Sequence, residues 1–299
     1  MLTGRIGDAG QLERLRQLMQ GTQTRIRDAE VAVSSGKIAG GFDAIGRDTG
    51  MLLRARDARA SVQAQLDETT RTGDRLRVTD GAVSRLADIA ERLRSLLVQR
   101  LDSSSGALVP LADEAASMLD DAESQLNTQL DGRYLFAGSR TDAPAVDIPD
   151  AATAADPALY YKGDGVRLSV RADTTTEIAY GVTADDPAIA DLLAALGQAV
   201  TADQASDRSG LEAALDRAGE AVKGLAELRG GIGATQARVE SAGDRHRDTS
   251  LYLDEIISRI EDTDLASAMS SLAQDRASLE ASYLVTSTLS KLSLVDYLR

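Results

Sequence analysis

The sequence predicts a mainly α-helical protein: an elongated multi-helix rod with coiled-coil helices at both termini and a small central β insertion. Two patterns support this fold class. Heptad stripes of apolar residues run through both ends of the chain, whereas short alternating runs and three of the five prolines lie in its middle. Aromatic residues make up only 3% of the chain. The core must therefore be aliphatic and rich in alanine, which suits close packing of helices.

The apolar stripe near the N-terminus advances in steps of three and four residues, the spacing of a coiled-coil seam. A similar stripe near the C-terminus is interrupted by Arg276. An isolated helix is marginal in water, so each stripe needs a partner. The stripes could be the core of a monomeric bundle, but their place at the two ends favours burial between molecules. The predicted assembly seam consists of Leu12, Leu15, Met19, Ile26, Val33, Leu265, Met269, Leu272, Leu279 and Tyr283.

Breaks in the helical pattern predict five segments. The first break falls at Gly40 and Gly41, strand-like texture begins after Gly132, and helical periodicity returns at Pro187. The segments are an N-terminal coiled-coil helix (1–40) that pairs with 262–299, the first part of a helical rod domain (41–138), a β-rich insertion (139–185), the second part of the rod (186–261) and a C-terminal coiled-coil helix (262–299).

Local chemistry predicts how several of these segments begin and turn. Lys162-Gly163-Asp164-Gly165 is predicted to be a hairpin turn, with strands following over 166–170 and 177–182. Asp185-Asp186 and Asp262-Thr263-Asp264 each precede a helical pattern. Because Asp accepts hydrogen bonds from the first free amides of a helix, both runs are predicted helix caps.

Composition argues against an enzyme and against several classes of partner. A net charge of −14 offers no basic surface for nucleic acid and disfavours an anionic membrane. Without cysteine, disulfides, thiolate metal sites and thiol nucleophiles are excluded. With only one histidine, no zinc site is expected, and no cofactor is expected. That histidine, His246, lies in a charged run and is predicted to face solvent. We find no signal-peptide pattern and no stretch apolar enough to span a membrane.

Several stretches resemble the flagellin-like axial proteins of the bacterial flagellum. Where many of these proteins carry an Asp-Asp-Pro turn after the first helix, this chain has Gly40-Gly41-Phe42. The stretches similar to the family are Ser34–Lys37 and the closing segments Asp262–Ala266, Leu279–Tyr283 and Leu292–Leu298; those typical of its hook-associated protein 3 subfamily are Gly132–Ser139 and Tyr160–Asp164.

The resemblance implies a structural subunit that joins the hook to the filament by helical self-assembly through its terminal helices. It also implies export through the flagellar type III apparatus with a dedicated chaperone, and a place in the extracellular flagellum. Its partners would be other copies of itself, a neighbouring hook-associated protein and flagellin. One alternative is that the chain is flagellin, the bulk filament subunit. Another is an enzyme or sugar-binding protein built on the central insertion, although no catalytic residues cluster there.

Overall fold

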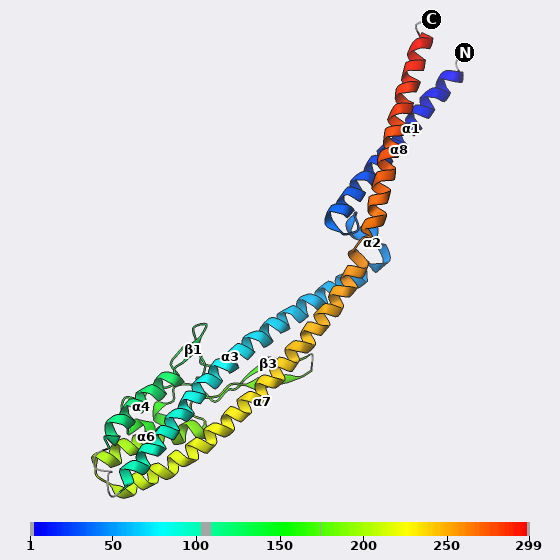
Figure 1. Cartoon of the computed structure of the whole chain (residues 1–299). Helices are drawn as coiled ribbons and strands as arrows, with labels where there is room; N and C mark the ends of the chain where they lie inside the picture. Colours follow the sequence, from blue (N-terminus) through cyan, green and yellow to red (C-terminus); the bar gives the residue numbers. More distant parts are fainter. Residues whose placement is uncertain (1–2, 103–108, 174, 298–299) are drawn as a thin grey trace. The chain divides into compact units, whose positions relative to one another are not determined.

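The computed structural model describes residues 3–102, 109–173 and 175–297, with the side chains of the terminal helices described from residue 13 and up to residue 288. Helices dominate this part of the chain, as predicted (Figure 1). The helices are α1 (Thr3–Ser35), α2 (Gly41–Ile45), η1 (Gly46–Asp48), α3 (Thr49–Leu101), α4 (Leu111–Leu126), η3 (Thr153–Ala155), α5 (Pro157–Tyr160), α6 (Pro187–Gln204), α7 (Arg208–Glu261) and α8 (Leu265–Tyr297). Two antiparallel strand pairs join them: β1 (Gln129–Leu130) with β2 (Arg133–Tyr134), and β3 (Leu168–Arg171) with β4 (Glu177–Tyr180).

The chain divides into two compact units. Unit 1 combines Met1–Ser61 with Thr249–Arg299, and unit 2 is Val62–Asp248. The long helices α3 and α7 contribute residues to both units. None of the described helices is long and apolar enough to cross a membrane. The division of the chain into the five segments named above stays a prediction.

Helix boundaries in unit 1 follow from glycine and aspartate chemistry. After α1, Gly36 and Gly40 have φ values of 71° and 94°, which residues with a side chain rarely adopt. The predicted break at this point is confirmed. At the start of α8, the amides of Ala266 and Ser267 donate to Oδ1 of Asp264 at 3.0 and 3.3 Å. The predicted cap of the last helix is therefore also present.

Unit 2 contains one aliphatic core to which helices and loops both contribute. The apolar face of α4 packs against α6, and helix α6 begins at Pro187 with Asp186 accepting from the Ala188 amide at 3.1 Å. Residues of the predicted β-rich insertion, such as Val146 and Tyr160, are fully buried in this same core. Each large apolar side chain buried here contributes about 1.5–3 kcal/mol.

The prediction that Lys162-Gly163-Asp164-Gly165 is a hairpin turn is wrong. The hairpin lies further along the chain, where β3 pairs with β4 in the register Leu168↔Tyr180 to Arg171↔Glu177. Its turn is stabilised by Asp173, whose Oδ1 accepts from the Thr175 amide at 2.7 Å. The two predicted strands are confirmed with slightly different bounds. The Lys162–Gly165 stretch instead packs against Ala137, because Asp164 N donates to Ala137 O at 3.2 Å.

The prediction that His246 faces solvent is also wrong. Its side chain is only 6% exposed, and its Nε2 atom has no hydrogen-bond partner among the described residues. Helical spacing explains this, since His246 shares one face of α7 with the buried residues Val239 and Ala242. The charged neighbours in sequence point elsewhere on the same helix.

Candidate functional site: the terminal helix pair and its joint

Helices α1 and α8 lie side by side and run antiparallel (Figure 1). Contacts along the pair fix this direction. The Thr286 hydroxyl donates to Sδ of Met19 at 3.8 Å, and Nε2 of Gln23 donates to the Tyr283 hydroxyl at 3.0 Å. The structure thus brings two residues of the predicted seam, Met19 and Tyr283, to the boundary between the helices.

Two ion pairs set the register of the helix pair. Arg25 contacts both carboxylate oxygens of Asp275, with Nη2–Oδ1 at 2.9 Å and Nε–Oδ2 at 3.2 Å. The hydrogen bond and charge of Asp275 raise the pKa of Arg25 above its ordinary value. Arg276, which interrupts the predicted C-terminal stripe, pairs with Glu30 at 2.6 Å. Surface ion pairs contribute little to stability. We therefore infer that the role of these two pairs is to align the helices.

The helix pair covers the predicted seam only in part. Within it, α1 buries the small side chains Thr22 and Ala32. The predicted seam residues Leu15, Met19, Ile26, Val33, Leu272 and Leu279 are partly covered, whereas Leu265, Met269 and Tyr283 are exposed and the side chain of Leu12 lies outside the described residues. Two helices can cover only one face of each other. Large apolar side chains therefore remain in solvent on both.

Backbone hydrogen bonds tie the loop after α1 to the loop before α8. The amide of Ile38 donates to Glu261 O at 2.7 Å, and the amide of Thr263 donates to Gly36 O at 2.9 Å. We call this crossing of two loops the joint; it comprises residues 36–48, the first turns of α3 and residues 261–264. It connects segments that are more than 200 residues apart in the sequence.

A buried carboxylate lies at the centre of the joint. Glu261 is 4% exposed, its Oε2 lies 2.8 Å from Nζ of Lys37, and its Oε1 forms an ion pair with Arg56. Burial acts to raise the pKa of Glu261, but hydrogen bonds and charges from Lys37 and Arg56 outweigh it and hold the pKa below its ordinary value. The carboxylate is therefore ionised at neutral pH.

Beside this carboxylate the joint contains a hollow of about 160 Å³. The Arg56 guanidinium lies over the Phe42 ring, 6.0 Å from its centroid. This site was not predicted from the sequence. Only one feature of the sequence could have indicated it: the aromatic residue Phe42 in a glycine-rich loop, where the chain differs from similar proteins. The lining residues are Lys37, Ile38, Gly41, Phe42, Ile45, Leu52, Arg56 and Glu261.

The two subfamily-like stretches of the sequence pack against each other in unit 2. Ser139 donates to Asp164 through its amide (2.8 Å to Oδ1) and its hydroxyl (2.5 Å to Oδ2). The hydrogen bond from the Ser139 side chain is the main reason that the pKa of Asp164 lies below its ordinary value. Gly138 has a φ of 67°, and a Cβ atom there would lie 2.1 Å from Asp164 O. This close approach requires glycine.

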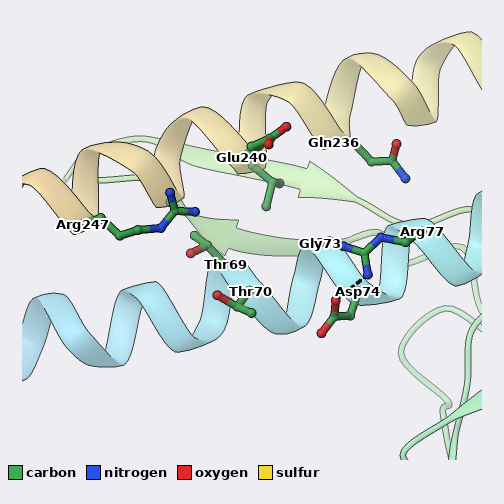
Figure 2. A pocket seen from close by; sticks show the side chains of 10 residues that line it. Thr69, Thr70, Gly73, Asp74, Arg77, Gln236, Glu240 and Arg247 are labelled. Atoms are coloured by element: carbon green, nitrogen blue, oxygen red, sulfur yellow. Dashed lines mark hydrogen bonds and ion pairs between the residues drawn. The ribbon is translucent and has the colours of Figure 1, made fainter.

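A polar groove of about 430 Å³ lies between α3 and α7 in unit 2 (Figure 2). Small residues such as Gly73 and Gly243 line it. Its arginines are engaged nearby: Arg77 pairs with Asp74 at 2.8 Å, and Arg247 pairs with Asp244. Within the described part of the chain, no group of three or more His, Cys, Asp or Glu residues could hold a metal ion.

Comparison with protein families finds two matching sequence models. The bacterial flagellin N-terminal helical region matches residues 11–141, and the bacterial flagellin C-terminal helical region matches residues 215–298. Together they cover more than half of the chain, including most of both terminal helices. No curated protein matches the sequence.

Solved structures with a similar fold include proteins from Vibrio parahaemolyticus, Bacillus cereus and Legionella pneumophila. A putative flagellar hook-associated protein from Vibrio parahaemolyticus has 15% identity and a TM-score of 0.58, over 71% of this chain and 96% of that one. FlgL from Bacillus cereus has 16% identity and a TM-score of 0.55, over 69% and 98%. The flagellar junction protein FlgL from Legionella pneumophila has 13% identity and a TM-score of 0.51, over 71% and 98%. At such low identity these matches establish the fold.

Proposed function

This chain belongs to the bacterial flagellin family, and from that premise we propose that it is the structural subunit that joins the flagellar hook to the flagellin filament. It acts by helical self-assembly through α1 and α8. The chain is a structural protein, not an enzyme, in keeping with its family. Membership places it among the axial components of the extracellular flagellum.

The observation that carries the assembly proposal is the incomplete burial of the terminal helix pair. Helix α8 leaves Met269, Tyr283 and Leu284 about half exposed or more, and α1 leaves Leu18 and Val31 so. A folded monomer gains nothing from apolar side chains kept in water. Contact with further copies buries them. We propose that the predicted seam residues on both helices contribute to this contact.

The fold similarities favour a junction protein over a filament flagellin. Two of the similar solved structures are described as a putative flagellar hook-associated protein and as a flagellar junction protein. In addition, the Gly132–Ser139 stretch typical of that subfamily is present here, and it makes a specific contact through Ser139 and Asp164. Both observations support a place between hook and filament.

The proposal includes specific partners and a route. The neighbours of this subunit are other copies of itself, a second hook-associated protein and flagellin. The chain leaves the cell unfolded through the flagellar export apparatus, guarded by a dedicated chaperone. The absence of cysteine supports this route, because a chain without thiols cannot form disulfides before it refolds outside.

Deleting the gene in its own organism tests the proposal. A junction subunit is required for filament attachment but not for the hook. The mutant should therefore show bare hooks by electron microscopy and should secrete flagellin into the medium as unassembled monomer. The wild-type gene supplied in trans should restore filaments. Filaments of normal length in the mutant would refute the junction role, and missing flagellin with intact export of other subunits would favour the alternative that the chain is flagellin.

A further inference from the structure

The hollow at the joint has the size and lining to receive one large apolar side chain. Its volume is about 160 Å³. Apolar cavities of about 150 Å³ hold a group of the size of benzene. Leu52 is buried beneath it, while Ile38 and Phe42 are 38% and 48% exposed. An exposed aromatic ring beside an arginine is the composition that protein interfaces favour at their centres.

The hollow also carries an excess of positive charge. The side chains of Lys37 and Arg56 are 57% and 46% exposed, and the one carboxylate that lines the hollow, Glu261, is shared between them. A complementary partner would present an apolar side chain with a carboxylate close beside it.

The outer face of α8 presents such a combination. Among the described large apolar side chains, Leu284 is the most exposed at 70%, and Val285 beside it is about half exposed. Glu280 lies one helical turn before Leu284 on the same face and is also exposed. No ion pair among the described residues involves Glu280. We call Glu280 and Leu284 together the α8 projection.

The projection and the hollow of one chain cannot meet. Leu284 follows Leu265 by 19 positions in one continuous helix, which places it about 28 Å along α8 from the joint at 1.5 Å per residue. The occupant must come from a second copy. Because the two surfaces differ, such a contact is heterologous and can repeat in an open series.

We propose that Leu284 of one copy inserts into the joint hollow of the next copy, with Glu280 beside Lys37 and Arg56. This contact rests on the proposed function and names one interface of that assembly. It gives the glycine-rich loop around Phe42 a role that its sequence alone does not explain. It also uses apolar surface that the α1–α8 pair leaves open.

The absence of cysteine allows a direct test by cross-linking. The double variant Ile38→Cys/Leu284→Cys is expressed in the deletion strain, flagella with attached hooks are isolated and mildly oxidised, and the chains are separated without reductant. Bridged cysteines need Cα atoms within about 7 Å, so a bridge within one chain is excluded. A ladder of dimers, trimers and larger species is expected. Ile45→Cys/Leu284→Cys is a second pair that should give the same ladder.

The matched control moves one cysteine to α7. Leu251 is 68% exposed, nearly as much as Leu284, but lies on α7, outside both terminal helices and the predicted seam. Ile38→Cys/Leu251→Cys should remain monomeric. In parallel, Leu284→Ala should weaken the contact about tenfold and lower the number of attached filaments, whereas Leu251→Ala should not.

The outcomes separate this inference from the proposed function. If the wild-type gene restores filaments but neither cysteine pair gives a ladder, or the Leu251 control gives the same ladder, the contact is refuted and the junction role stands. If the wild-type gene fails to restore filaments that the deletion removed, the proposed function fails, and the contact fails with it.

Discussion

Gly138→Ala tests whether the contact between the two subfamily-like stretches holds this part of unit 2 together. Gly138 has a positive φ of 67°, and its missing Cβ leaves room for the backbone of Asp164. An added Cβ would lie 2.1 Å from Asp164 O, far inside van der Waals contact. Alanine must therefore move the Asp164 loop away from Ser139 or distort the chain at residue 138.

The size of the effect can be worked out by comparison with Gly132. Its φ is 73°, almost the same, but nothing lies within 4 Å of a Cβ placed there. Gly132→Ala therefore suffers only the cost of a left-handed alanine, about 1–2 kcal/mol. Gly138→Ala adds an overpacking cost of about 1–3 kcal/mol. We expect Gly138→Ala to lower the free energy of unfolding by about 2–5 kcal/mol.

Urea unfolding followed by circular dichroism measures both variants, and hydrogen exchange locates the change. Gly138→Ala should increase exchange at the amides of Ser139 and Asp164, which are hydrogen-bonded in the structure. Gly132→Ala should leave both amides protected. Equal losses of stability in the two variants, or unchanged protection in Gly138→Ala, would refute the steric argument.

Three further predictions concern charged and buried groups. Because hydrogen bonds from Ser139 lower the pKa of Asp164 from its ordinary 3.8, this contact stabilises the folded state above that pH and is lost as the pH falls through the lower folded value; Asp164→Asn should flatten the acid limb of stability against pH. Glu261→Gln should cost about 1.5–3 kcal/mol and increase hydrogen exchange at the joint, whereas Glu255→Gln, at an exposed pair, should do neither. His246→Ala should lower the free energy of unfolding by about 1–3 kcal/mol, because it empties a buried site, and should lower the urea midpoint accordingly. An unchanged midpoint would contradict this prediction.

Local sequence patterns predicted much of the fold. The apolar periodicity of the ends indicated α1 and α8, and glycine and aspartate chemistry placed the break at Gly40 and the cap at Asp264. These features depend on residues within a few positions of each other. They are therefore visible in the sequence without knowledge of the tertiary contacts.

Features that depend on distant residues could not be predicted in this way. The buried place of His246 follows from the face of α7 that packs inward, and its charged neighbours in sequence concealed this. Gly163 and Asp164 have turn-like composition, yet they are positioned by Ala137 and Ser139.

The joint is a further case of long-range assembly. Lys37, Arg56 and Glu261 come from three separate segments, and only the fold brings the two cations to one carboxylate. The hollow beside them has no pattern of its own in the sequence. The predicted seam, by contrast, needed only helical spacing, and its role in assembly remains to be tested.

We propose that this subunit occupies the junction between hook and filament, and its location in the flagellum tests this most directly. Antibodies raised against the purified full chain, detected with gold on isolated flagella by electron microscopy, would show where the protein lies. Label should be confined to a short band between hook and filament. Label along the whole filament would contradict the junction role and identify the chain as a filament subunit.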